Sequence, residues 1–196
     1  MSKGKIVLIT IGVAIVLLIG GVFTTYNGLV TKDEAVANSW ANVQAQYQRR
    51  SDLIPNLVNV VKGYAQHESE TLQGVVNARA KATQMSVSAD NLTPEKMRQI
   101  QAAQGELTRA LGKLLSITEN YPNLKANENF SELQAQLEGT ENRINVSRKN
   151  YNETVQIYNV SVRRFPANIV AGMFGFDKKT PFEADSAAQN APKVEF

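Results

Sequence analysis

The chain begins with one continuous apolar run and then shows the periodicity of amphipathic helices. Ile6 to Phe23 are 18 consecutive residues without a charged side chain. An α-helix of about 20 apolar residues covers the ~30 Å hydrocarbon core of a bilayer, so this run is at the short end of a membrane span. Because every backbone amide inside hydrocarbon must be satisfied within its own segment, a helix is the stable form there. We predict a transmembrane helix from Ile6 to Phe23 that anchors the protein.

A cleaved signal peptide is the alternative interpretation of this run. The apolar core of a signal peptide normally has about 7–15 residues and ends at a small-x-small cleavage site. The core here is longer, and the residues after Gly20 (Gly-Val-Phe-Thr-Thr-Tyr) show no Ala-x-Ala pattern. An uncleaved anchor is therefore favoured.

The charges that flank the apolar run predict its orientation. Lys3, Lys5 and the amino terminus precede the run, whereas the next ten residues contain only Lys32, beside Asp33 and Glu34. Basic residues are retained on the cytoplasmic side of a span. We expect a single-pass protein of the inner (cytoplasmic) membrane, with its N-terminus in the cytoplasm and the remainder on the periplasmic or extracellular side. The margin is two charges, and the opposite orientation would make the remainder a cytoplasmic platform.

The first amphipathic stretch follows an expected linker at residues 24–30. It starts with a capping box at Thr31–Glu34, in which hydroxyl and carboxylate satisfy the first free amides of a helix. We expect this helix to continue to about residue 84. Its seam repeats every 3.5 residues, as in one helix of a bundle or coiled coil. The seam contains Val36, Trp40, Val43, Tyr47, Arg50, Ile54, Leu57, Val61, Tyr64 and Glu68.

Two further amphipathic stretches predict a second and a third long helix. The second begins with Thr93 as N-cap and Pro94 at the first helical position, where the missing proline N–H costs nothing. The third opens near residues 127–129 and extends to Phe165. Pro166 is expected to end it, because the residue before a proline is kept out of the helical region.

These elements predict an all-α fold. We expect an N-terminal transmembrane helix followed by an elongated antiparallel helical bundle of three long helices, plus a short C-terminal helix within residues 167–176. The expected divisions are a basic flank at residues 1–5, the anchor, the linker, the bundle at 31–183 and a mobile polar tail at 184–196.

Polar residues interrupt the seam of the first helix. Arg50 and Glu68 occupy seam positions, and Arg49 and Asp52 lie beside Arg50. These side chains fix the register of the helices or line an interaction surface, or else their long stems reach solvent at the bundle edge. Pro55 lacks an N–H and clashes with the carbonyl four residues earlier, so we expect a bend just before it. We treat these five residues as candidate interaction or register residues.

A Tyr-Asn pair is repeated at a spacing of seven in the third helix. Tyr151 and Tyr158 then share one face, and Asn152 and Asn159 share the next. One interpretation is a paired amide surface for a partner. The favoured interpretation is structural, with tyrosines at the core edge and amides bonding to neighbouring helices.

The composition offers few catalytic groups. The absence of cysteine excludes disulfides, thiolate metal sites and cysteine nucleophiles, and the single histidine, His67, has Thr71 where a zinc-binding helix needs a second histidine. Acidic residues are spread along helix faces, and there is no Gly-x-Ser-x-Gly or phosphate-binding loop. We predict no catalytic residue, cofactor or metal. Without Lys3 and Lys5 the chain has 19 basic and 18 acidic residues, so we expect no nucleic-acid partner.

A series of short motifs follows in order along the chain. They are Trp40-x-x-Val43, Gln48-Arg-Arg-Ser-Asp-Leu-Ile-Pro-Asn-Leu-Val58, Val61-Lys-Gly-Tyr-Ala-x-His-Glu68, Tyr121-Pro-x-Leu-Lys-Ala-Asn-x-x-Phe130, Glu138-x-Thr-Glu-Asn-x-Ile144, Arg148-x-x-Tyr-Asn152, Phe165-Pro-x-Asn168 and Gly175-Phe176. Together they resemble the LemA family of bacterial membrane proteins over roughly residues 1–183. The resemblance implies a single-span protein with a helical-bundle domain, no settled enzymatic activity, and an association with envelope maintenance that includes membrane metalloproteases. It implies no catalytic residues.

From these observations we expect a membrane-anchored scaffold or adaptor of the bacterial envelope, acting through protein–protein interaction and self-association. The expected partners are the lipid bilayer, further copies of the chain, and an envelope protein or membrane protease. The span has no Gly-x-x-x-Gly, so we expect the soluble bundle to hold the homo-oligomer. The alternative function is a regulator or hydrolase of envelope turnover linked to membrane stress.

Overall fold

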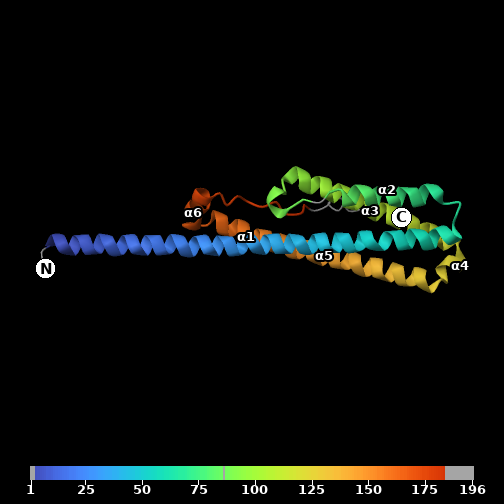
Figure 1. Cartoon of the computed structure of the whole chain (residues 1–196), viewed down its shortest axis with the longest axis horizontal. Coiled ribbons are helices and arrows are strands. Elements are labelled where there is room, and N and C mark those ends of the chain that lie inside the picture. The colour runs from blue at the N-terminus through green and yellow to red at the C-terminus, as the bar shows by residue number, and fades with distance from the viewer. Residues whose placement is uncertain (1–2, 86, 184–196) are drawn as a thin grey trace, which may run out of the picture.

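The computed structural model describes residues 3–85 and 87–183, and this part of the chain is helical without any strand (Figure 1). The predicted all-α fold is confirmed. The expected tail at 184–196 lies outside the described residues. In chain order the elements are α1 (Lys3–Tyr64), α2 (Ser69–Thr83), the 3₁₀ helix η1 (Ala89–Asn91), α3 (Pro94–Ile117), the 3₁₀ helix η2 (Thr118–Asn120), α4 (Pro122–Lys125), α5 (Glu128–Arg163) and α6 (Ala167–Phe174).

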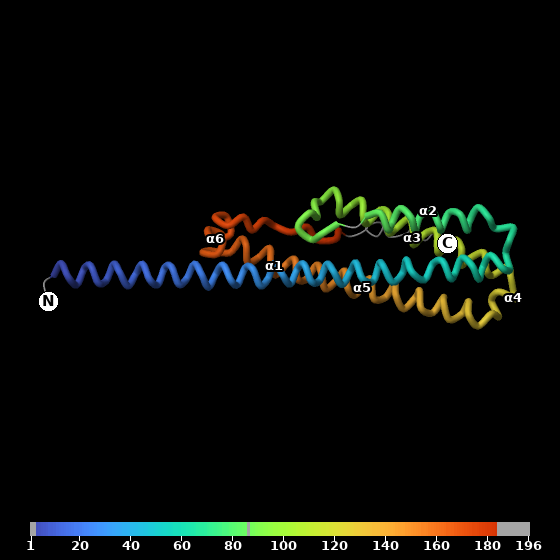
Figure 2. Tube along the Cα trace, viewed as in Figure 1, coloured from blue at the N-terminus to red at the C-terminus, as the bar shows by residue number. Residues whose placement is uncertain are grey.

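The helices form an elongated bundle from which the start of α1 projects. α5 returns along α1, α2 packs on both α3 and α1, and α6 packs against α1 and α5. Figure 2 shows the N-terminal part of α1 extending alone beyond the other elements, with α6 at the end of the bundle nearest to it.

α1 passes without interruption from the apolar run into the bundle. Its 62 residues correspond to roughly 93 Å at 1.5 Å per residue. The expected linker at residues 24–30 is wrong, because these residues are helical. The expected capping box is wrong too, since the Thr31 hydroxyl donates to the Asn27 carbonyl at 2.9 Å, one turn back in the same helix. The apolar run and the first bundle helix are thus one element.

The first bundle helix ends earlier than expected. α1 stops at Tyr64, the chain turns through residues 65–68, and α2 starts at Ser69 rather than prolonging α1 to about residue 84. Thr71, Val75, Ala78 and Ala82 are buried in α2 at steps of four, three and four residues, the spacing of the seam of α1. Because the period continues across the turn, it does not reveal that the chain reverses. The bundle therefore contains α2 as a separate helix.

The other helix boundaries follow the predicted signals. Thr93 Oγ1 accepts a hydrogen bond from the Lys96 amide at 3.2 Å and caps α3, whose first residue is Pro94. Asn127 Oδ1 accepts from the Phe130 amide at 3.0 Å and caps α5. α5 ends at Arg163, two residues before the predicted end, within the usual uncertainty of helix boundaries.

The buried apolar residues form two cores along the bundle. The proximal core, nearer the anchor, contains Leu29, Val36, Trp40, Val43, Leu92, Met97, Ile100, Tyr151, Val155, Tyr158, Val162, Val170, Ala171 and Phe182. The distal core contains Ile54, Leu57, Val61, Ala65, Leu72, Val75, Ala78, Ala82, Leu107, Leu111, Leu114, Leu124, Phe130 and Leu137. Along α1, the buried Arg50 lies between the two sets.

Candidate functional site

The chain returns over the proximal core after α6. Gly175 ends α6 with φ of 74°, a left-handed conformation that glycine adopts without strain. The amides of Gly175 and Phe176 both donate to the Ala171 carbonyl, which satisfies the helix end and reverses the chain. Residues 177–183, here called the strap, then run back along α5 without helical structure.

The two asparagines of the Tyr-Asn repeat hold the strap by its backbone. Asn159 donates to the Lys179 carbonyl at 2.8 Å and accepts from its amide at 2.9 Å. Asn152 makes the same pair of bonds with Phe182, at 3.1 and 2.8 Å. Seven helical residues rise about 10.5 Å and three extended residues about 10 Å, so the two spacings match. The amides were expected to bond neighbouring helices, but they bind an extended segment instead.

The strap closes the proximal core with an aromatic side chain. The ring of Phe182 is buried, 5.9 Å from that of Trp40 and 5.4 Å from that of Tyr151, measured between ring centroids. The Tyr151 hydroxyl donates to the Thr180 carbonyl at 2.9 Å, and the Arg148 guanidinium lies 4.6 Å over the Phe182 ring. The tyrosines therefore fill the core edge as predicted, and sequence reasoning missed the segment that covers them.

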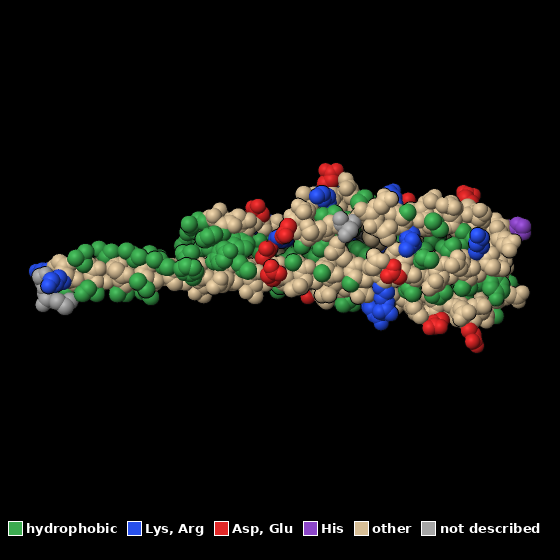
Figure 3. Space-filling view, in the orientation of Figure 1, with side chains coloured by type: hydrophobic (Ala, Val, Ile, Leu, Met, Phe, Trp, Pro, Cys, Tyr) green, Lys and Arg blue, Asp and Glu red, His purple; other side chains and the backbone are tan. Residues whose placement is uncertain are grey.

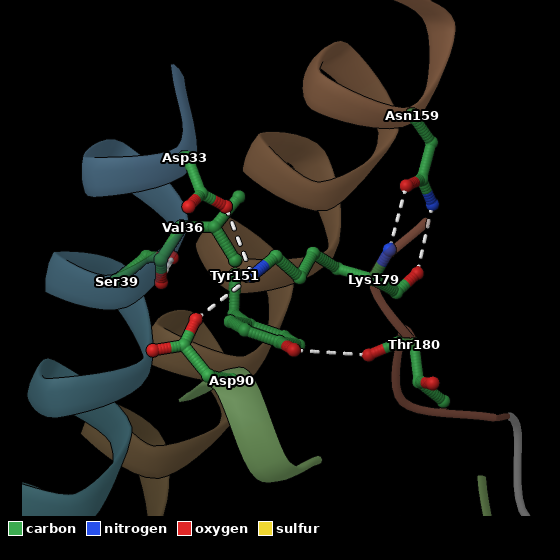
Figure 4. Close-up of polar contacts among 8 residues, drawn as sticks. All are labelled: Asp33, Val36, Ser39, Asp90, Tyr151, Asn159, Lys179 and Thr180. Atoms are coloured by element: carbon green, nitrogen blue, oxygen red, sulfur yellow. Dashed lines mark hydrogen bonds and ion pairs between the residues drawn. The ribbon is translucent and has the colours of Figure 1, made fainter. Parts of the chain in front are cut away.

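Lys179 ties the strap to two other parts of the bundle. Its Nζ lies 2.9 Å from Asp33 Oδ1 on α1 and 3.0 Å from Asp90 Oδ1 on η1 (Figure 4). Burial lowers the pKa of Lys179, but hydrogen bonds and charge from Asp33 and Asp90 outweigh it, so that the pKa lies above its usual value. The strap is consequently held by the ion pairs of Lys179, by hydrogen bonds to its backbone and by the buried ring of Phe182.

Both tyrosines of the repeat are held in their neutral form. Burial raises the pKa of Tyr151 to about 12, against a weaker lowering by Lys179. Burial, reinforced by Asp33, raises the pKa of Tyr158 to about 12 as well. A neutral Tyr151 hydroxyl is the donor that its bond to Thr180 requires.

Arg50 forms a second polar centre, between the two cores. Its side chain is only 2% exposed and donates to Glu141 at 2.6 Å and to Thr108 at 3.1 Å. A third donor bonds Gln104. Arg50 therefore does not reach solvent, and it links α1 with α3 and α5 as a register residue would. The sequence singled out Arg50 but none of these three bonds, since Glu141 is 91 positions away.

Pro55 leaves the Ser51 carbonyl free to accept a hydrogen bond from the neighbouring helix α2. A proline has no N–H, so the Ser51 carbonyl has no helical partner at position 55. Arg79 of α2 donates to this carbonyl through Nε at 2.8 Å. Pro55 itself is exposed, and α1 continues through it. The residue thereby supplies a docking point for α2.

The remaining predicted residues do not join either centre. Arg49 and Asp52 are exposed, and Asp52 accepts a hydrogen bond from Gln48 at 2.7 Å. Glu68 accepts from the Tyr121 hydroxyl at 3.2 Å at the far end of the bundle. Of the nine candidate residues, Tyr151, Asn152, Tyr158 and Asn159 therefore lie under the strap, Arg50 forms the second centre, and Arg49, Asp52, Pro55 and Glu68 belong to neither.

Hollows in the surface lie beside several of these groups. One of about 370 Å³ lies beside Arg50 and is lined also by Arg98, Arg109, Arg148 and Glu141. One of about 490 Å³ lies beside Lys179, and a shallow one of about 790 Å³ includes His67. Across residues 3–85 and 87–183, no three His, Cys, Asp or Glu side chains are arranged to hold a metal ion.

The N-terminal part of α1 meets the requirements of a membrane span. It contains an 18-residue stretch of mean hydropathy 3.0, and none of that stretch is buried in the protein. Figure 3 shows this projecting part covered with apolar side chains, in contrast to the mixed surface of the bundle.

The chain is similar to several curated proteins. Magnetosome protein MamQ 2 of Paramagnetospirillum magneticum is 24% identical over 191 positions, covering 89% of this chain and 70% of the relative. Magnetosome protein MamQ of Magnetospirillum gryphiswaldense is 23% identical, covering 99% and 78%. Protein LemA of Metamycoplasma hominis is 26% identical, covering 84% and 69%. The LemA family profile matches residues 39–196, and the chain therefore belongs to the LemA family.

Proposed function

We propose that this protein is a membrane-anchored scaffold of the bacterial envelope that acts through protein–protein contacts, including contacts between its own copies. The observation that carries the proposal is the continuity of α1. One helix provides both the unburied apolar stretch and the buried seam from Leu29 to Val61. Because no loop separates them, the bundle is held as a rigid extension of the anchor, as the display of binding surfaces at a membrane requires.

The strap supports a role in protein recognition. Asn152 and Asn159 on α5 bind an extended segment through its backbone, while Phe182 fills an apolar site. Backbone bonds combined with a side-chain pocket are the means by which proteins recognise extended peptides. The bundle surface is thus built for contacts of this kind. An envelope protein or membrane protease is the class of partner we propose beside a second copy of the chain.

A hydrolase would require free carboxylates that face one another in a hollow. The hollow beside Arg50 is lined by Glu141 and Glu183, the hollow beside Lys179 by Asp33, Asp90 and Asp177, and the hollow at the far end of the bundle by His67 and Glu70. Glu141 is paired with Arg50, and Asp33 and Asp90 are paired with Lys179, so these three carboxylates neutralise cations and hold elements together. Their pairing favours the scaffold over the hydrolase.

Self-association is the part of this function that can be tested directly. Confinement to a membrane raises the effective concentration of copies, so weak lateral contacts of a long bundle add up. We expect the full chain in mild detergent to be larger than a monomer by light scattering. The matched control replaces residues 6–23 with a leucine span of equal length, and its oligomers should persist. A monomeric full chain, or loss of oligomers in the control alone, would contradict the proposal.

A further inference from the structure

We propose that α6 and the residues before it lie in the membrane interface, where their exposed apolar face contacts lipid and gives the bundle a second attachment to the bilayer. This inference rests on the proposed anchoring by α1. It assigns a lipid-binding surface to a helix whose apolar residues the packing of the bundle leaves uncovered.

The first observation is the exposed apolar face. Ile169 and Met173 are 54% and 71% exposed and lie four residues apart in α6, so they share one side of this helix. Phe165, in the turn just before α6, is 77% exposed. Val170 and Ala171 are buried on the other side, against the bundle. α6 is thus apolar on both sides, and only one side is covered by protein.

The second observation is the height of α6 along α1. The ring of Tyr26 contacts Phe174 and Phe176, with ring centroids 4.8 and 5.6 Å apart. Tyr26 follows Phe23, the last residue of the apolar run, by three positions, or about 4.5 Å of helix. The headgroup layer beyond the hydrocarbon is about 5–7 Å thick on each side. α6 therefore lies at the level of the lipid headgroups.

The surface of the molecule shows the same continuity. In Figure 3 the apolar side chains around α6 gather directly beside those of the projecting part of α1. An exposed apolar patch continuous with a membrane span faces lipid once the span is inserted. A protein partner on this face would have to displace the bilayer surface, so lipid is the occupant to which we commit.

The charges around α6 suit anionic lipids. Arg163 and Arg164 precede the apolar face and Lys178 follows it, and all three are exposed. Asp177 is exposed beside them, and Asp33 and Asp90 line the same hollow together with a fourth cation, Lys179. The local charge is therefore positive. Apolar residues flanked by exposed basic residues are typical of helices that lie in the headgroup region, with lipid phosphates as the partners of the cations.

The absence of cysteine allows a direct depth measurement. The full chain carries one new cysteine labelled with an environment-sensitive fluorophore and is reconstituted in vesicles of phosphatidylcholine and phosphatidylglycerol in equal amounts. Spin-labelled lipids then quench any fluorophore within the bilayer. Met173→Cys reports on α6, Val16→Cys on the anchor, and Val146→Cys on an exposed position of α5 far from the anchor. All three side chains are exposed, so labelling leaves the buried cores intact.

We expect strong quenching at position 16, quenching at position 173 by a shallow spin label, and little at position 146. If position 16 is not quenched, the anchoring itself fails. If position 16 is quenched while position 173 behaves like position 146, the anchor stands and the inference about α6 is wrong.

A second set of variants tests the chemistry of the contact. A fluorophore at Phe165→Cys is compared with and without the exposed substitutions Ile169→Glu and Met173→Glu. We expect the glutamates to reduce quenching at position 165 several-fold, since carboxylates withdraw from the acyl boundary. The matched control places glutamates at the exposed Ile157 and Val160 of α5 and should leave it unchanged. The lipid contact would be overturned if quenching at position 165 were equal with and without the glutamates at 169 and 173, or if the control glutamates at 157 and 160 reduced it as much.

Discussion

The proximal and distal cores share α1 and α5 but are built differently. The distal core is aliphatic apart from Phe130 and is enclosed by helices. The proximal core contains Trp40, Tyr151, Tyr158 and Phe182. The strap closes it through hydrogen bonds to the strap backbone and through the ion pair of Lys179 with Asp90 of η1. The difference indicates that helix packing alone encloses the core far from the apolar run. The core nearer the apolar run is closed by specific side-chain contacts with an extended segment.

The largest expected effect comes from a cavity made in the distal core alone, which tests whether the two cores are independent. Leu57 is fully buried in the distal core, and Leu→Ala at such a site costs about 3 kcal/mol of unfolding free energy. Trp40 is the single tryptophan and lies in the proximal core, so its emission reports on that core alone. We expect Leu57→Ala to lower the unfolding free energy in urea while the native emission of Trp40 stays the same. A shifted native emission would show that the cores are not independent.

The boundary between the cores is tested by the pair of Arg50 and Glu141. Glu141→Ala leaves the Arg50 charge buried without its carboxylate. Breaking a fully buried pair costs about 3–5 kcal/mol, and because Glu141 is 39% exposed, water replaces part of the loss and we expect about 2 kcal/mol. The control Arg50→Met removes the charge but keeps the stem, and it should cost less in the same urea titration. A greater loss of unfolding free energy in Arg50→Met than in Glu141→Ala would contradict the expectation that the unpaired buried charge is what destabilises the protein.

A smaller loss of unfolding free energy is expected when the strap is released from the bundle. Asn152→Ala removes two hydrogen bonds to the backbone of Phe182, and partly exposed bonds of this kind contribute about 1 kcal/mol in total. Release of Phe182 exposes the Trp40 ring, so its emission shifts to the red without loss of helicity by circular dichroism. The control Asn150→Ala changes an exposed amide on the same helix. Unchanged emission in Asn152→Ala would show that the aromatic contacts hold the strap without the amide.

A separate effect is expected at alkaline pH. Tyr151 and Tyr158 have folded pKa values of about 12, whereas the same groups in the unfolded chain ionise near 10. The folded state therefore binds more protons between about pH 10 and pH 12, so stability is complete below pH 10 and falls as pH rises through 12. The raised pKa of Lys179 acts in the same direction.

We expect the melting temperature to fall over that range, and less so in Tyr151→Phe. The phenolate absorbance of the folded wild-type chain should show a late step that this variant reduces. A melting temperature that stays constant up to pH 12 would contradict the burial of these phenols.

Local signals explain which elements the sequence predicted. α3 and α5 have caps at Thr93 and Asn127, and their apolar period matches their buried faces. The turn at residues 65–68 was missed because α2 repeats the same period on its own buried face. The strap was missed because seven extended residues have no period. The sequence signal for the strap lies in α5, which binds it, as the seven-residue spacing of Asn152 and Asn159.

Long-range partners explain the rest of the candidate site. Arg50 was conspicuous in a seam of apolar residues, yet its bond to Glu141 spans 91 positions and leaves no local pattern. Pro55 was expected to bend its helix, whereas the observed consequence is a carbonyl offered to Arg79. A single sequence identifies such residues as exceptions, and only the packed helices identify their partners.

The unbroken α1 also makes the molecule a lever. From Phe23 to Tyr64 the helix extends about 61 Å beyond the apolar run, so a change of about 10° in the tilt of the span would move the far end of the bundle by about 11 Å. Spans change tilt when bilayer thickness changes. With the apolar run inserted as proposed, small differences in membrane thickness would be converted into displacements as wide as a helix, at the end of the bundle that contains His67 and α4.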